Sequence, residues 1–310
     1  MAEITAALVK ELRELTGLGM MECKKALTEA GGDIKKAEEL LRVKSGAKAS
    51  KAASRIAAEG VIGTYVSPDG KVGALVELNS ETDFVAKNED FVAFAKSLAE
   101  IAATRDPKDV EELSALDLMG TKIEARRQAL VQKIGENMTI RRMEKLTVND
   151  GVVVGYVHNA VAPGLGKIGV LIALESTGDK AKLEALGKQI AMHTAAAFPK
   201  FLHRDHVDAS VLEREKNVLR EQAIAEGKKP EIVEKMLDGR VRKFYEEIVL
   251  LEQDFVMDPD TKINKLLENA TKDVGAPIAL TGYARIQLGE GIEKEEVDFA
   301  AEVAATAKRA

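Results

Sequence analysis

Few side chains in this sequence have the types and spacing that catalysis requires. Residues 164–169 (GLGKIG) match the GxGxxG pattern of nucleotide-binding loops, but a loop with Pro163 precedes them and a predicted strand follows. A dinucleotide-binding loop needs a strand before the glycines and a helix after them. His203 and His206 stand three residues apart, but neither an HExxH motif nor a cysteine accompanies them. A surface pair is therefore favoured over a metal site.

The remaining reactive groups are equally poor candidates for catalysis. The sequence contains neither a GxxxxGK[ST] phosphate loop nor a GxSxG nucleophile elbow. Cys23 is the only cysteine and lies in an amphipathic stretch, which predicts a core residue. His193 is also predicted to be buried and structural. We therefore expect that the protein is not an enzyme, holds no metal or other cofactor, and acts on another protein.

Composition and charge narrow the classes further. The chain has 310 residues, of which 45% are hydrophobic and 31% charged, as in a soluble protein of about two domains. Its formal net charge of −6 disfavours a general nucleic-acid binder, because such proteins are usually basic. No apolar run approaches the ~18 residues of a membrane span, and the N-terminus does not resemble a signal peptide. We expect a cytoplasmic protein without nucleic-acid or membrane contacts.

The segment Thr82–Val85 (TDFV) lies where a predicted strand ends and a predicted helix begins. By themselves these residues favour an ordinary corner, in which Thr82 or Asp83 caps the helix and Phe84 lies in the core. The alternative is that Phe84 is exposed and contacts a partner. The residues alone favour the first interpretation and leave the second open.

The first 55 residues predict a helical bundle and a basic linker. A helix that begins after Thr5 stops at Gly17, a second covers 20–30, and a third begins after Asp33, which is placed as its N-cap. Three short helices make a small core, so the bundle is expected to attach to something larger.

Residues 40–58 contain no acidic side chain. The basic residues of this stretch are Arg42, Lys44, Lys48, Lys51 and Arg55. We interpret it as a solvated helical linker, and the alternative is a basic strip that meets an acidic partner.

A repeat organises the rest of the chain. Residues 60–65 (GVIGTY) resemble 151–156 (GVVVGY), and residues 71–78 (KVGALVEL) resemble 167–174 (KIGVLIAL). The pattern of each copy predicts two strands followed by an Ala-rich helix. Two copies indicate two related α+β units with antiparallel sheets.

We therefore predict a multi-domain α+β fold. The bundle and linker cover 1–55, and the core subdomains cover 56–148 and 149–288. A helical, coiled-coil hairpin at about 208–250 is inserted in the second subdomain, and a C-terminal helical module covers 289–310. Apolar surface left over on the hairpin could support a homodimer, but such hairpins often bury their own apolar faces, so monomer and homodimer both stay open.

Two stretches of the sequence are specific, namely 12–27 (LRELTGLGMMECKKAL) and 77–87 (ELNSETDFVAK). Together they resemble the two signature stretches of the bacterial translation elongation factor Ts family. Further matches lie at Gly31–Asp33, Ile134–Asn137, Ile190–His193 and Gly289–Glu293. The resemblance thus spans almost the whole chain.

This resemblance implies a fold and a function. The fold consists of a ubiquitin-associated-like bundle, two core subdomains, a coiled-coil hairpin and a C-terminal module. The function is that of a guanine nucleotide exchange factor, which binds the GTPase elongation factor Tu and releases GDP so that GTP can enter. The factor itself binds no nucleotide. Thr82, Asp83, Phe84 and Val85 match the positions that dislocate the magnesium ion of the GTPase, with Phe84 as an apolar wedge.

The resemblance also implies further contacts with elongation factor Tu. The matching positions are Leu12, Met20, Met21, Lys24, Lys51, Ile134, Gly135 and His158. From the sequence alone, the methionines could instead be core residues, and His158, expected in a turn after a strand, could be a bystander. The competing function is a peptide- or RNA-binding module that uses the bundle and the basic linker.

Overall fold

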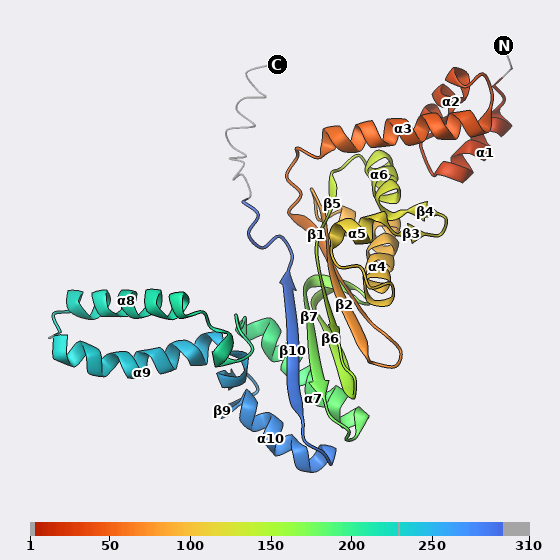
Figure 1. Cartoon of the computed structure of the whole chain (residues 1–310). Coiled ribbons are helices and arrows are strands. Elements are labelled where there is room, and N and C mark those ends of the chain that lie inside the picture. The colour runs from red at the N-terminus through yellow and green to blue at the C-terminus, as the bar shows by residue number, and fades with distance from the viewer. Residues whose placement is uncertain (1–3, 229, 294–310) are drawn as a thin grey trace.

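The computed structural model describes residues 4–228 and 230–293, and its N-terminal part is a three-helix bundle (Figure 1). Helix α1 (Ala6–Thr16) begins at Thr5, whose Oγ1 accepts a hydrogen bond from the backbone N–H of Leu8, and ends at Gly17 with φ 67°. Helix α2 (Met20–Glu29) follows, and Asp33 caps α3 (Ile34–Ala52) as predicted. The bundle core contains Val9, Leu12, Leu18, Cys23, Ala26, Leu27, Ala37 and Leu41.

Helix α3 covers the predicted basic stretch as far as Ala52, and residues 53–58 lead from its end to β1 without helix. One face of this stretch is buried, because Ser45, Ala49 and Ala52 pack against α6 (Ile123–Ile134). Small side chains at these positions let the two helices approach closely. The stretch is therefore helical as far as Ala52, as expected, but the expectation that it is solvated was wrong for one face, because that face packs against the core.

The core of the protein is one antiparallel sheet of six strands. The order is β10 (Ala279–Gln287), β7 (Leu165–Glu175), β1 (Glu59–Val66), β2 (Val72–Ser80) and β5 (Met138–Thr147), while β6 (Gly151–Ala162) also pairs with β7. Strands β1 and β7 come from different copies of the repeat and are paired where Ile62 faces Gly166 and Gly63 faces Leu165. The sheet therefore crosses the predicted boundary between the subdomains.

The two copies of the repeat also pack face to face. Alternate residues of each strand point to opposite sides, so Val61 packs under a helix whereas Ile62 faces the other copy. The inner layer contains Ile62, Leu75, Val148, Val153, Leu171, Ala173, Ala284 and Ile286. Two glycines allow the close approach: a Cβ at Gly73 would lie 2.7 Å from Cγ1 of Val153, and one at Gly169 would lie 2.5 Å from Cγ2 of Ile62.

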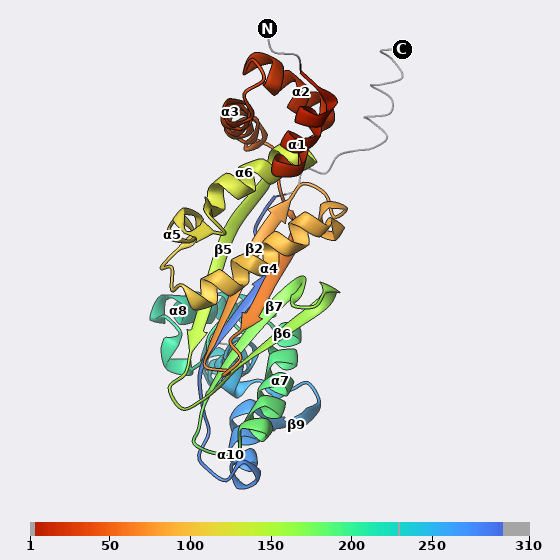
Figure 2. The ribbon, with the colours of Figure 1, turned by 90° about the vertical axis from the view of Figure 1, so that its right-hand side faces the viewer.

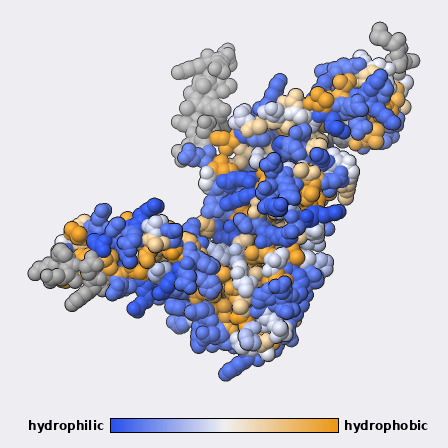
Figure 3. Space-filling model, in the orientation of Figure 1, coloured by the Kyte–Doolittle hydropathy of each residue, from blue (hydrophilic) through white to orange (hydrophobic). Residues whose placement is uncertain are grey.

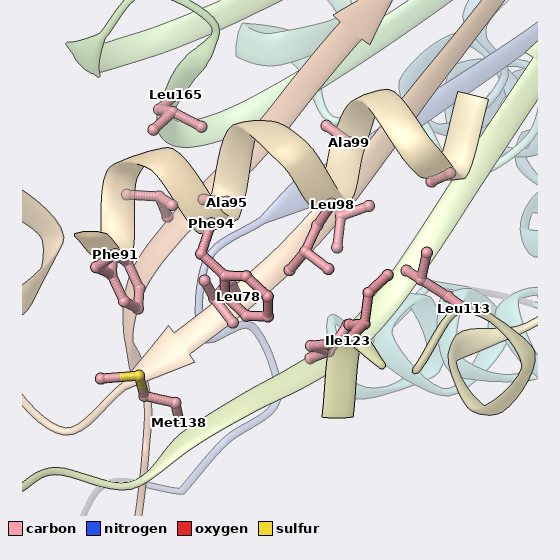
Figure 4. Packing of buried hydrophobic residues seen from close by; sticks show 14 of the residues in the cluster. Leu78, Phe91, Phe94, Ala95, Leu98, Ala99, Leu113, Ile123, Met138 and Leu165 are labelled. Carbon is pink, nitrogen blue, oxygen red and sulfur yellow. The ribbon is translucent and has the colours of Figure 1, made fainter. Parts of the chain in front are cut away.

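Helices cover the outer faces of this double layer (Figure 2). Helix α4 (Glu89–Thr104) lies over β1 and β2, and α7 (Lys180–Ala197) lies over β6 and β7. Beneath α4, Phe91, Phe94 and Leu98 point toward the sheet and its neighbours (Figure 4). Helix α10 (Ile263–Val274) packs beside α7. The predicted α+β class with antiparallel sheets is confirmed.

The hydrophobic spacing of residues 110–134 is typical of helix, but the helical structure there is interrupted. Helix α5 (Val110–Ala115) gives way to a small hairpin of β3 (Asp117–Leu118) and β4 (Thr121–Lys122) before α6 begins. Its turn places Met119 and Gly120 at φ 52° and 79°, and the N–H of Gly120 donates to Oδ1 of Asp117. This tight turn stops the helix, and hydrophobic spacing did not reveal it.

The helical hairpin of α8 (Ala209–Ala225) and α9 (Pro230–Ile248) projects from the second copy of the repeat (Figure 1). It follows the short 3-10 helix η2 (Arg204–His206) and leads into η3 (Leu250–Glu252), β8 (Asp254–Phe255) and β9 (Asp258–Lys262). After β10 the chain turns at 289–291. The rest of the predicted C-terminal module, residues 294–310, lies outside the described residues.

Candidate partner-binding site

The ring of Phe84 stands on the surface at the corner between β2 and α4. Its side chain is 78% exposed, whereas the next two residues, Val85 and Ala86, are 5% and 2% exposed and belong to the core. They form the 3-10 helix η1 (Val85–Lys87), and Asn88 caps α4 by accepting hydrogen bonds from the N–H groups of Asp90 and Phe91. The corner interpretation was therefore wrong in both parts, since Asn88 is the cap and Phe84 is not in the core.

Residues 81–84, here called the Phe84 loop, are tied to the turn between α6 and β5 by two glutamates. The N–H and hydroxyl of Thr82 donate to the two carboxylate oxygens of Glu136, at 2.9 and 2.7 Å. In the opposite direction, the N–H of Asn137 donates to Oε1 of Glu81. Each segment thus supplies one carboxylate to the backbone of the other, and we call this pair the Glu81–Glu136 clamp.

The end of the bundle linker joins the same network. A guanidinium nitrogen of Arg55 lies 3.1 Å from Oε1 of Glu81 and donates to the carbonyl of Gly135 at 3.1 Å. The side-chain amide of Asn137, which is 3% exposed, donates to the carbonyl of Arg55 at 2.7 Å. Three segments that are distant in sequence therefore meet at this place.

The structure brings several predicted contact residues together around this network. Helix α6 ends at Ile134, which is half-buried, and Gly135 follows with φ 91°, the left-handed conformation that glycine adopts without strain. Both residues precede Glu136, which holds Thr82, and Asp83 is exposed beside Phe84. Ile134, Gly135 and the Phe84 loop thus form one surface. The expectation that Val85 touches a partner needs correction, because its side chain is buried and anchors the loop from below.

The bundle offers a second apolar surface (Figure 3). Met20 and Met21 are 59% and 64% exposed, so they are surface residues, and Lys24 is exposed on the same helix. Leu12, in contrast, is 0% exposed in the bundle core. The expectation that Leu12 touches a partner needs correction, because its side chain is inaccessible. Leu15, one turn further along α1 and 62% exposed, lies at the surface instead.

A groove of about 400 Å³ lies between the bundle and the core. It is lined by the end of α1, by residues of α4 and α6, and by the β3–β4 turn. Leu15 and Met119 contribute exposed apolar side chains, and the buried Phe94 lies at its floor. Lys133 spans its rim and pairs with Asp90 at 2.7 Å. The groove connects the exposed part of the bundle with the beginning of α4, near the Phe84 loop.

Two further predicted contact residues, Lys51 and His158, lie on other elements. Lys51 is exposed in the last turn of α3. His158 was expected in a turn, but β6 extends to Ala162, so His158 lies within a strand on the other half of the sheet. It is exposed, and its Nδ1 lies 3.1 Å from the hydroxyl of Tyr156.

Much of the basic strip is used inside the chain. Lys44 pairs with Glu29 at 2.6 Å, and Lys48 lies 3.5 Å from Glu22, while Arg55 contributes to the network described above. Lys48 also donates to the carbonyl of Gln132 at 3.0 Å. Three of the five bases thus join the bundle and α3 to acidic groups of this chain, which weakens the alternative of an RNA-binding strip.

The sequence patterns suggestive of catalysis have structural explanations. The GxGxxG glycines lie at the β6–β7 turn and in β7, where a Cβ at Gly166 would lie 2.4 Å from Cγ1 of Val157. His203 and His206 are exposed neighbours with ring centroids 5.4 Å apart. Over residues 4–228 and 230–293, no group of three His, Cys, Asp or Glu side chains could hold a metal ion.

His193 is buried and structural, as predicted. Its Nδ1 accepts a hydrogen bond from the N–H of Val256, so Nε2 carries the proton and donates to Oε1 of Gln253 at 2.9 Å. Burial in these surroundings lowers the pKa of His193, and the hydrogen bond to Gln253 opposes this shift. The neutral imidazole thereby links α7 to the segment that follows the hairpin.

Sequence reasoning missed the residues that hold the Phe84 loop. Glu81, Glu136 and Arg55 bring together positions that are 54 to 82 residues apart in the chain, as in the bonds of Thr82 to Glu136 and of Asn137 to Arg55. The only signal in the sequence was the matching stretch Ile134–Asn137, and it did not indicate which residue Glu136 binds.

A search of the described helices for a membrane span, that is, a long and apolar helix, finds none in that part of the chain.

Fold and site together define an α+β protein with a helical bundle, a projecting hairpin and an apolar contact surface held at a strand-to-helix corner. The family model described as "Elongation factor TS" matches residues 81–290. Elongation factor Ts of Rhodospirillum centenum is 57% identical over 309 residues, 99% of this chain and all of the relative. Those of Rhodospirillum rubrum and Rhizobium leguminosarum bv. trifolii are 56% and 53% identical, over 100% and 99% of this chain and all of each relative. The chain belongs to the elongation factor Ts family.

Proposed function

We propose that the protein is a guanine nucleotide exchange factor that binds elongation factor Tu. Binding disturbs the magnesium and phosphate site of the GTPase and releases GDP, so that GTP can bind during translation elongation. The observation that supports this proposal most directly is the exposed ring of Phe84, presented by an anchored loop. An exposed phenylalanine on a held loop is suited to insertion into a partner.

The proposed mechanism needs no covalent step. Phe84 inserts as an apolar wedge between helices of the GTPase and shifts the segments that hold Mg²⁺. The diphosphate then loses the cation that neutralises its charge, and its hold on the protein weakens. Thr82 and Asp83 join the contact beside the ring, Asp83 as an exposed charge, and Val85 anchors the loop through its burial. The protein is thus an exchange factor, not an enzyme, and needs no cofactor.

The remaining contact residues anchor the complex in this proposal. Met20 and Met21 offer flexible apolar side chains to a helix of the GTPase, with Lys24 at the edge of the contact. Ile134 and Gly135 extend the surface of the Phe84 loop, and Lys51 and His158 make outlying contacts. Their distribution over the bundle and both halves of the sheet fits a partner that spans much of the molecule. We place this activity in the cytoplasm.

The deciding experiment measures the release of a fluorescent GDP from elongation factor Tu by substoichiometric amounts of the protein. Phe84→Ala removes an apolar anchor worth about 1.5–3 kcal/mol, so exchange at low concentrations should fall by roughly one to two decades. Met257→Ala is the matched control, because Met257 is a 50% exposed apolar side chain on the β8–β9 turn.

Because Phe84 is exposed, Phe84→Ala should have the far-UV circular dichroism and the thermal unfolding of the parent protein. Exchange at the parent rate by Phe84→Ala would rule out the wedge. The alternative, a peptide- or RNA-binding module built on the bundle, predicts instead that Phe84→Ala has no effect and that RNA binds the strip of residues 40–58.

A further inference from the structure

The Phe84 loop has few apolar anchors of its own. On one side β2 ends at Ser80, and on the other side the buried pair of Val85 and Ala86 begins. Between them, Asp83 and Phe84 are exposed, and the backbone adopts neither helix nor strand. What holds this stretch is polar: the Glu81–Glu136 clamp and a hydrogen bond from the hydroxyl of Ser80 to the carbonyl of Thr82 at 2.9 Å.

We propose that Glu136 is a positioning residue for exchange: its carboxylate fixes Thr82 and thereby keeps Phe84 in the conformation that enters the partner. This inference rests on the proposed function, because it gives Glu136 a role only through Phe84. Glu136 itself is half-buried behind the loop and uses both carboxylate oxygens on Thr82.

The geometry of the contact explains why a carboxylate is needed. The backbone N–H and the hydroxyl of Thr82 point to different oxygens of the same group, at 2.9 and 2.7 Å. Two parallel hydrogen bonds to one charged group restrict both the position and the orientation of the residue that donates them. Because Phe84 is only two residues further along, fixing Thr82 limits the directions in which its ring can point.

The support behind Glu136 is rigid. Its neighbour Asn137 is buried, donates through its side chain to Arg55, and donates its backbone N–H to Glu81. Strand β5 begins at the next residue, Met138, which is 0% exposed. The clamp therefore connects the loop to the sheet at a point that cannot move without disturbing the core.

Order in the free protein has a measurable consequence for exchange. If the loop sampled many conformations, only a fraction would present Phe84 correctly, and the apparent affinity for the partner would fall by that fraction. Once bound, the wedge would be in place whether or not the clamp existed. Loss of the clamp should therefore raise the concentration of factor needed for half-maximal exchange and leave the maximal rate nearly unchanged.

The test compares Glu136→Ala with Glu136→Gln and with Glu144→Ala, a control that removes an exposed glutamate from β5. We expect Glu136→Ala to raise the half-saturating concentration by roughly tenfold, with a maximal rate within about twofold of the parent. Glu136→Gln keeps one acceptor oxygen and should be intermediate. Glu144→Ala should behave like the parent protein.

Two further measurements separate positioning from general damage. In hydrogen–deuterium exchange, Glu136→Ala should lose protection at the amide of Thr82, while α4 and the sheet keep theirs. In the double variant Glu136→Ala/Phe84→Ala, the half-saturating concentration should lie close to that of Phe84→Ala alone, because the ring is the main group that the clamp positions.

The outcomes distinguish this inference from the proposed function. If Phe84→Ala exchanges nucleotide like the parent, the wedge and the inference both fail. If Phe84→Ala is impaired and Glu136→Ala is not, the wedge stands and the positioning role is overturned. A double variant that is tenfold worse than Phe84→Ala also overturns it, because Glu136 would then act independently of the ring.

Discussion

Phe84 is exposed because its neighbours supply the anchors that its own ring would otherwise provide. Val85 and Ala86 fill the space under the corner, and Asn88 satisfies the first N–H groups of α4. The ring therefore forgoes about 1.5–3 kcal/mol of burial in the free protein. Burial of the ring against a partner would release this free energy and so contribute to binding.

His193 is the residue whose protonation should affect stability. Burial lowers its pKa in the folded protein, so the unfolded chain binds the proton more readily. The contribution of His193 to the free energy of unfolding is therefore fully present above about pH 6.5, the ordinary histidine pKa. It is lost as the pH falls from there through the lowered pKa of the folded protein. Urea unfolding between pH 7.5 and 5 should show this loss in the parent protein.

The variant His193→Gln tests the assignment of that loss. Glutamine cannot bind the proton, so part of the pH dependence of the unfolding free energy should disappear. The variant should also be less stable than the parent at pH 7.5, because it disturbs the hydrogen bonds to Gln253 and Val256. An unchanged pH dependence would show that other groups cause the acid sensitivity.

Among the elements, the helical hairpin is the most separable. Its entry and exit are hydrogen-bonded to each other: the N–H of Lys200 donates to the carbonyl of Ile248, and that of Leu250 to the carbonyl of Phe201, both at 2.8 Å. Ala223, Val233 and Leu237 are buried, whereas Val218, Ile224 and Ile232 are 43–53% exposed. The hairpin thus closes on itself at its base and keeps apolar surface along its length.

Replacing residues 208–247 by a short Gly-Ser linker should leave the core folded. The two ends are already adjacent, so a few residues suffice to close the gap. The variant should retain a cooperative unfolding transition, with helical circular dichroism reduced by the two lost helices. Unfolding of the core would contradict the insertion.

Light scattering of the same variant addresses the oligomeric state. If the exposed apolar residues of the hairpin form a homodimer, the parent should be dimeric and the variant monomeric. Equal states in both proteins would exclude the hairpin as the dimer contact.

At the scale of the molecule, local sequence patterns predicted the helices and strands better than they predicted the tertiary contacts between them. Some features depend only on residues that are near in sequence, and the sequence predicted these correctly. They are the end of α1 at Gly17, the start of α3 at Asp33, the strand pair around 60–79 and the helical hairpin. The exposure of Phe84 and the burial of Leu12 depend on what packs against them. Family resemblance indicated the first correctly and the second incorrectly, because a signature stretch contains core and contact residues alike.

The joined sheet makes a prediction for the whole molecule. Gly73→Ala and Gly169→Ala each place a methyl group closer than 3 Å to the side chains of Val153 or Ile62 in the inner layer. Each variant should lose about 1–3 kcal/mol of unfolding free energy by overpacking, measured in urea. The losses should be similar, and exchange by the remaining folded protein should be normal. A large loss in only one variant would show that the two glycines are not equivalent.

That equivalence follows from the contacts themselves. Gly73 approaches Val153 and Leu171, while Gly169 approaches Ile62 and Leu75, and these four residues hold matching places in the two copies of the repeat. Such reciprocal contacts are the mark of an isologous interface, so the core is arranged like a homodimer whose protomers share one chain. A true homodimer must display every feature twice. Here the second corner is the short turn Ser176–Asp179, so of these two corners only the first displays a phenylalanine.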